Sequence, residues 1–181
     1  MVEIRDNPRL TTVDGLDRVE AAESISLRDN PRLRTWAGLP LLSEVETWEV
    51  MGQPMLQTWT AGPRLSIIGA YTIEGCDGLE RVPGLPDLTR LGRLRIADNE
   101  SLSSLAGFTA SRSGHPTVDR VEVTGNPRLP AAAVEQLLDR MHLPSSAEAV
   151  VVEGNGTSVQ RAPEAGAGAE PAGLQQEQSG E

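Results

Sequence analysis

Apolar and polar residues alternate over short stretches that recur at a regular spacing along this chain. Each stretch begins with an apolar residue and has a second one two positions later, as in Val2 and Ile4 or Ile25 and Leu27. The first five starting positions are 23 residues apart, a sixth follows after 27, and the pattern restarts once more: Val2, Ile25, Trp48, Tyr71, Leu94, Val121 and Val150. A period of two indicates a strand with one buried face, so every copy of the repeat is predicted to contain a strand.

A second column of residues lies five positions after each start. It consists of Asn7, Asn30, Gln53, Cys76, Asn99, Asn126 and Asn155. A chain that turns out of a strand leaves backbone N–H and C=O groups without partners, and side chains stacked at one position can satisfy them. We interpret this column as a structural ladder at the strand exits. Within it, Cys76 is expected to be a buried, weakly donating thiol and not a nucleophile.

A leucine column follows three residues beyond the ladder, and further apolar columns fill the rest of each copy. The leucines are Leu10, Leu33, Leu56, Leu79, Leu102 and Leu129. Such coils are too short to bury their apolar residues alone, which is typical of a solenoid whose neighbouring coils complete the core. The sequence therefore predicts a mainly β protein with short helices, a parallel β-solenoid of about 23-residue coils over residues 1–157. Its aromatic core positions are predicted to be Trp36, Trp48, Trp59 and Tyr71.

The repeat is interrupted twice before the last strand. The copy that begins at Leu94 has four extra residues and loses its apolar column, so we expect a loop over 109–116 that carries Arg112 and His115. Loops on a rigid scaffold often bind partners, and a tolerated surface insertion accounts for this one equally well.

The second interruption is an amphipathic pattern between two prolines. Val134, Leu137, Leu138 and Met141 predict a helix that either replaces the connecting arm of the last full coil or covers the open end of the core, followed by a capping strand at Val150. Nothing precedes the strand at Val2 as a cap, so an exposed N-terminal solenoid end or a start further upstream is expected.

Composition narrows the possible partners. The 181 residues carry a net charge of −10, which argues against a nucleic-acid or anionic-membrane partner. A single cysteine excludes an intramolecular disulfide and a cysteine-based zinc site, and the two histidines show no ligand spacing, so we expect no metal and no cofactor. No apolar run is long enough to span a membrane. Residues 158–181 are rich in Ala, Gly, Glu and Gln and predict a disordered, acidic tail.

The copy ISLRDNPRLRTWAGLPLL resembles the receptor L-domain family, the leucine-rich-repeat-like module of insulin and epidermal growth factor receptor ectodomains that also occurs in bacterial envelope proteins. The likeness covers residues 2–155. It implies a right-handed solenoid that binds protein or extracellular ligands, located in the cell envelope or outside the cell. No export signal is present in this sequence, so a true start at Met1 would instead indicate the cytoplasm.

Outward positions of the central strands give the candidate binding face. It consists of Glu49, Met51, Thr72, Glu74 and Arg95, which mix an exposed apolar residue with charges of both signs and so suit a modest protein interface. An ordinary solvated strand face is the competing interpretation.

Three functions remain open for this fold. The first is a noncatalytic recognition module, expected to be a monomer. The second is a structural spacer, or a fragment of a solenoid, with no specific ligand. The third, less favoured, is a β-helix enzyme acting on polysaccharides, in which Glu49 and Glu74 would form a carboxylate pair; no Asp cluster, Lys base or third polar partner accompanies them, so we expect no catalytic residues.

Overall fold

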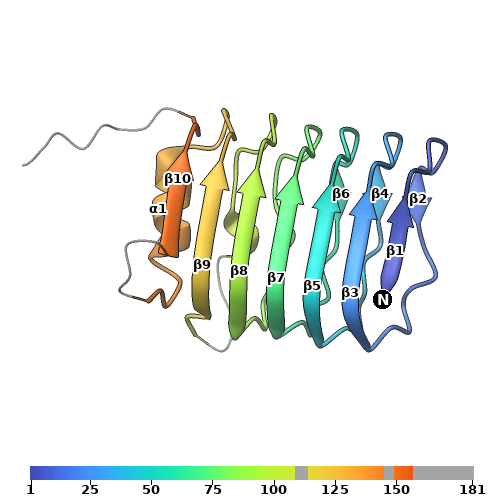
Figure 1. Cartoon of the computed structure of the whole chain (residues 1–181), viewed down its shortest axis with the longest axis horizontal. Helices are drawn as coiled ribbons and strands as arrows, with labels where there is room; N and C mark the ends of the chain where they lie inside the picture. Colours follow the sequence, from blue (N-terminus) through green and yellow to red (C-terminus); the bar gives the residue numbers. More distant parts are fainter. Residues whose placement is uncertain (109–113, 145–148, 157–181) are drawn as a thin grey trace, which may run out of the picture.

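The chain coils into a parallel β-solenoid, seen in a computed structural model that describes residues 1–108, 114–144 and 149–156. Its long sheet has seven parallel strands in the order β1-β3-β5-β7-β8-β9-β10. Their bounds are β1 (Val2–Arg5), β3 (Ala21–Arg28), β5 (Glu44–Met51), β7 (Ile67–Glu74), β8 (Arg90–Ala97), β9 (Thr117–Thr124) and β10 (Val150–Glu153). The strands stand side by side along the length of the molecule (Figure 1). The predicted fold class is confirmed.

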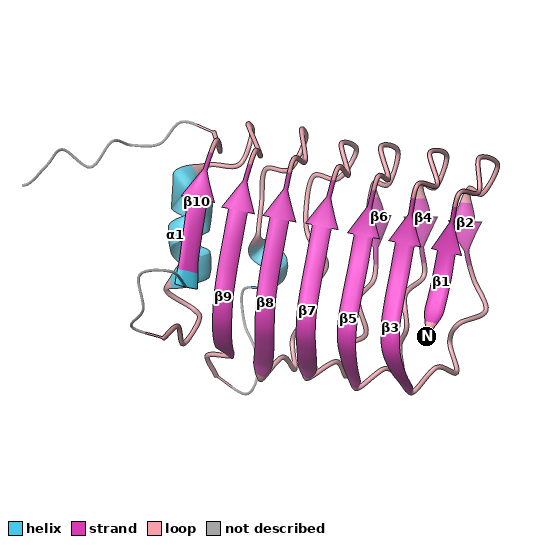
Figure 2. Ribbon diagram, viewed as in Figure 1, coloured by secondary structure: helices cyan, strands magenta, loops and turns pink. Residues whose placement is uncertain are grey.

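The return path of each coil runs behind the long sheet. In the first three coils it carries a short strand, β2 (Thr12–Val13), β4 (Thr35–Trp36) or β6 (Thr58–Trp59), and these pair into a three-stranded parallel sheet. Further along, a 3-10 helix, η1 (Ala106–Phe108), and then α1 (Ala131–Leu138) lie on this side (Figure 2). In the view of Figure 1 the chain runs up a long strand at the front and then returns down behind the sheet. It then enters the next long strand on the left, and this path makes the coil right-handed.

The register reproduces the spacing of the repeat. Val2 pairs with Ile25, Ile25 with Trp48, Trp48 with Tyr71, and Tyr71 with Leu94, so each of these partners lies 23 residues further along. Equivalent side chains are therefore stacked on one another. The core consists of such columns, and Leu33, Leu56, Leu79, Leu102 and Leu129 are all fully buried.

The strands begin earlier than the alternation of apolar residues suggests. Five of them are eight residues long and start four positions before the expected apolar residue, as β5 does at Glu44. In β5 the buried residues are Val45, Trp48 and Val50, so a spacing of three precedes the spacing of two. Glu46 falls between the paired positions 45 and 47 and is itself unpaired, and Glu23 and Gly69 are skipped in the same way on the neighbouring strands, so each strand has the same kink with two successive outward residues. This extra outward residue hides the first half of each strand from a period-two search.

The aromatic side chains pack inside the solenoid, as predicted. Trp36 contacts Trp48 edge-on with ring centroids 5.6 Å apart, and Trp48 contacts Tyr71 at 5.6 Å. Tyr71 in turn lies 6.3 Å from Phe108. All are buried, so this row of rings belongs to the core and forms no exposed ligand cage.

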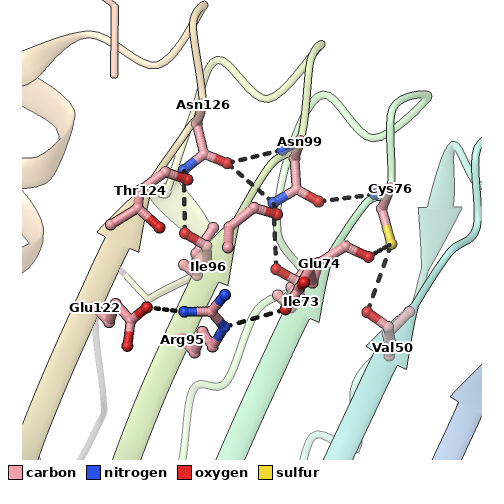
Figure 3. A network of polar contacts seen from close by, with 11 residues as sticks. Val50, Ile73, Glu74, Cys76, Arg95, Ile96, Asn99, Glu122, Thr124 and Asn126 are labelled. Carbon is pink, nitrogen blue, oxygen red and sulfur yellow. Dashed lines mark hydrogen bonds and ion pairs between the residues drawn. The ribbon is translucent and has the colours of Figure 1, made fainter. Parts of the chain in front are cut away.

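The ladder side chains bind the turns of successive coils (Figure 3). Nδ2 of Asn99 donates to the carbonyl oxygens of Ile73 and Ala97, and to Oδ1 of Asn126. Asn126 donates in the same way to Asn155, and the backbone N–H of Cys76 donates to Oδ1 of Asn99. These bonds satisfy buried carbonyl groups that the strand pairing leaves free, which is the predicted role.

Two ladder positions depart from asparagine, and each solves the problem differently. Sγ of Cys76 lies 3.6 Å from the carbonyl oxygens of both Val50 and Glu74, which correspond to the carbonyl partners of Asn99, and its single hydrogen is shared between them. Gln53 donates to the carbonyl of Met51, while its Oε1 is buried without a hydrogen-bond partner. The side-chain ladder is thus interrupted at Gln53 and resumes between Asn30 and Asn7.

Helix α1 replaces the connecting arm of the last full coil, which decides between the two predicted placements. It lies against η1 on the return side and buries Val134 and Leu137. β10 then pairs with β9 as the final strand. The two ends of the core differ from its middle, because Val2, Ile4 and Leu10 are only partly buried and Val152 is 42% exposed. The tail predicted at 158–181 lies outside the described residues.

Candidate binding face

The five predicted face residues lie together on the outer surface of the long sheet. Glu49 is in register with Thr72, and Thr72 with Arg95, across three neighbouring strands. Met51 is in register with Glu74 one step nearer the turns. All five are partly exposed, whereas the residues between them, such as Val50 and Ile73, are fully buried. The sheet therefore presents these side chains on one side and the core on the other.

Ion pairs across the strands order the charges of this face. Nε of Arg95 donates to Oε2 of Glu74 at 3.1 Å, and Nη1 of the same guanidinium pairs with Glu122 (Figure 3). On the other side of the patch, Arg28 pairs with Glu49, and this hydrogen bond raises the pKa of Arg28. The side chains are about one-third exposed, at 32% for Arg95 and 30% for Glu74. The charges are held in place between neighbouring strands and remain accessible from outside.

Glu49 and Glu74 are committed to different arginines. Glu49 points to Arg28 on β3, and Glu74 points to Arg95 on β8, so the two carboxylates are drawn toward opposite edges of the patch. The pairing suits a surface that recognises charge. It does not direct both carboxylates at one substrate position, which the hydrolase mechanism requires.

A hollow of about 600 Å³ opens on the same sheet, below the predicted face and nearer the starts of β3, β5 and β7. Acidic side chains line it at Glu23, Glu44 and Glu46, and Ile67 and Gly69 contribute an apolar wall. Ile67 is 43% exposed. Sequence reasoning missed this site because the kink breaks the alternation that marks outward positions; the acidic pair Glu44 and Glu46, two residues apart, was the available signal.

The predicted loop is described only in part. Arg112 lies outside the described residues, and His115 is exposed. The fold brings His115 close to His142, with ring centroids 5.7 Å apart, although the two residues are in different elements and share no sequence spacing. Within the described residues, no group of three or more His, Cys, Asp or Glu side chains is placed to hold a metal ion.

Cys76 is placed in the core and away from the outer face. Its side chain is fully buried, and burial raises the pKa of the thiol to about 12. The thiolate, which is the reactive form, is therefore suppressed at neutral pH. This environment agrees with a structural role in the ladder.

Comparison of the chain with protein-family models, with curated proteins and with solved structures finds no match. Among the helices of the described residues, none has the length and apolar character needed to cross a membrane.

Proposed function

We propose that this chain is a noncatalytic protein-binding module, and that the outer face of the long sheet around Met51 is its recognition surface. The observation that carries the proposal is the position of Met51. This flexible apolar side chain is partly exposed between the ion pairs of Arg28 with Glu49 and of Arg95 with Glu74. An apolar centre bordered by ordered charges is the composition of a small protein interface.

The scaffold supports this function by presenting the face without reorganisation. The backbone of each strand is bonded to a neighbour on both sides from β3 to β9, so binding would fix few additional degrees of freedom. The resemblance to receptor L-domains agrees with such a role, and with a location in the cell envelope or in a secreted protein.

The test removes the apolar centre and one charge together. The double variant Met51→Ser with Arg95→Ser is compared with wild type for binding of a partner captured from an envelope fraction and then purified. We expect binding at least about tenfold weaker, which corresponds to ~1.4 kcal/mol. The matched control is Met55→Ser with Arg64→Ser, which removes the same residue types from exposed turns.

Two outcomes oppose the proposal. Equal binding by the face variant and by wild type would show that the interface lies elsewhere on the molecule. A wild-type protein that captures nothing from any fraction and does not associate with itself would favour the structural spacer. Thermal unfolding of each variant shows whether a loss of binding is local or a loss of fold.

A further inference from the structure

The charges on the outer face are arranged symmetrically about β7 with their signs reversed. β7 is the middle strand of the seven, with three strands on either side (Figure 1). Glu44 on β5 and Arg90 on β8 are both in register with Ile67 of β7. Glu49 and Arg95 are likewise both in register with Thr72. At two levels, therefore, an acidic residue on one side of β7 matches a basic residue on the other.

The reversal is repeated at some positions nearer the edges of the sheet, although Glu23 on β3 and its equivalent Asp119 on β9 are both acidic. Arg5 on β1 is at the level of Arg28, and Glu153 on β10 is at the level of Thr124, which places Arg5 and Glu153 at matching heights three strands from β7. Two strands from β7, Arg28 on β3 corresponds to Glu122 on β9, one outward position lower.

A second copy of the chain complements this pattern. A two-fold axis parallel to β7 and above the sheet would place β5 of one copy over β8 of the other, so that Glu44 faces Arg90 and Glu49 faces Arg95 in both directions. The residues on the axis, Ile67, Ala70 and Thr72, are uncharged. Glu74 also lies there and pairs with its own Arg95. Arg95 pairs with Glu122 as well, Glu49 with Arg28 and Arg90 with Asp119, so at these positions a second copy adds a further partner, whereas Glu44 gains its first one. We propose that the long sheet is a self-complementary interface through which two copies of the chain pair face to face.

The acidic hollow adds an independent reason for a cationic occupant. Among the described residues, Glu23, Glu44 and Glu46 form no ion pair, and neither does the exposed Arg93 on β8. In the proposed pairing, Arg93 of each copy lies over the β5 strand of the other. The guanidinium groups of one copy thus enter the hollow of the other, and isolated charges on both become paired.

The size of the face predicts a weak dimer. Five strands about 4.8 Å apart, each about 26 Å long, cover roughly 600 Å² per copy, which is at the low end for specific interfaces. The net charge of −10 on each chain adds long-range repulsion. The interface departs from the monomer expected from the sequence. It rests on the proposed function, since it names a partner for the same sheet, and a bound copy would cover Met51.

The experiment reverses the charges on one side of β7 at a time. Glu44→Arg with Glu46→Arg makes an acid-reversed chain, and Arg90→Glu with Arg93→Glu makes a base-reversed chain. Sedimentation equilibrium is run over a range of concentrations for wild type, for each variant and for an equal mixture. Two matched control variants alter exposed positions outside the long strands. The acidic control is Glu80→Arg with Glu100→Arg, and the basic control is Arg32→Glu with Arg64→Glu.

Wild type should dimerise, and each reversed chain should dimerise at least tenfold more weakly, because like charges then face each other. The equal mixture should recover the dimer, since residue 44 of each variant again faces an opposite charge at residue 90 of the other, and the controls should behave as wild type. A wild type that stays monomeric, a dimer insensitive to both reversals, or a mixture of folded variants that fails to recover would each overturn the inference. A monomeric wild type that still captures another protein through Met51 and Arg95 would refute the self-pairing alone; failure of both tests would refute the proposed function as well.

Discussion

The ladder side chains provide hydrogen bonds to buried backbone groups, which apolar packing cannot provide. Where each coil leaves its long strand, the residue before the ladder position has a positive φ, and it is always Asp or Gly, as at Asp98 and Gly125. The chain turns there, and buried carbonyl groups point inward without a strand partner. The two amide hydrogens of Asn126 are shared among three acceptors from three different coils. Leaving such groups unpaired would cost about 1–3 kcal/mol each.

Cys76 should make the free energy of unfolding fall as the pH rises into the alkaline range. Burial raises its pKa to about 12, whereas an unfolded cysteine has a pKa of about 8.5. The native thiol therefore keeps a proton that the unfolded chain loses, so this contribution is complete below about pH 8.5 and is lost as the pH rises toward 12.

We expect the difference in unfolding free energy between wild type and Cys76→Ala to shrink by about 2 kcal/mol between pH 8 and pH 10. Urea denaturation of both proteins at several pH values measures it. A difference that stays constant over this range would mean that the native thiol ionises as readily as the unfolded one. The comparison with the variant is needed because burial also raises the pKa of Tyr71, which both proteins share.

Inward and outward residues of the same coil should differ sharply in their energetic roles. Leu56 is fully buried in the leucine column, so Leu56→Ala should lower the free energy of unfolding by roughly 2–5 kcal/mol by leaving a cavity. Glu49 retains 26% of its side-chain exposure in its pair with Arg28, and Glu49→Ala should cost less than about 1 kcal/mol. Chemical denaturation measures both, and equal small losses would contradict the assignment of the two faces.

At the scale of the coil, the elements that follow a strict local period could be predicted from the sequence. The upper half of each strand, the ladder and the leucine column repeat at a fixed position, and each is confirmed by burial or hydrogen bonding. The lower half of each strand could not be predicted in this way, because the kink at positions such as Glu46 gives two successive outward residues and breaks the period of two. The acidic hollow was missed for the same reason.

Two equivalent glycines allow the energetic cost of a strained backbone conformation to be measured apart from the cost of a steric clash. Gly15 and Gly38 occupy the same position in successive coils, and both have φ of +84°. A Cβ atom at Gly15 meets nothing within 4 Å, whereas one at Gly38 would overlap the backbone carbonyl oxygen of Thr60 in the next coil.

Gly15→Ala should therefore cost only the left-handed conformation, about 1–2 kcal/mol. Gly38→Ala should cost at least about 2 kcal/mol more, because Thr60 directly follows β6 and its N–H donates to the carbonyl of Trp36, so it cannot move without disturbing the return sheet. Thermal unfolding of the two variants compares them directly. Similar losses would show that neighbouring coils separate easily at this corner.

On the scale of the whole molecule, contacts between distant parts of the sequence decide what the repeat alone does not. The ring contact of His115 with His142 arises because the four-residue insertion and the segment after α1 meet at the start of β9, where Thr117 bridges to His142. The charge symmetry about β7 likewise appears only when seven strands are set in register. The sequence contains the charges, but their matching heights depend on the insertions that separate β8, β9 and β10.

Stability should vary along the solenoid, because each coil is held only by its neighbours. The central leucines are fully buried, whereas Val2, Ile4 and Leu10 of the first coil are partly exposed, and β1 pairs on one side only.

Backbone amides of β1 and β2 should therefore exchange with deuterium at least about a hundredfold faster than those of β5, β7 and β8, a difference of ~2.7 kcal/mol in opening free energy. Hydrogen–deuterium exchange followed by mass spectrometry of peptides from each coil tests this gradient. Equal protection of all strands would mean that the solenoid opens as one cooperative unit. In that case the interface between coils, and not the stability of each coil, would limit unfolding.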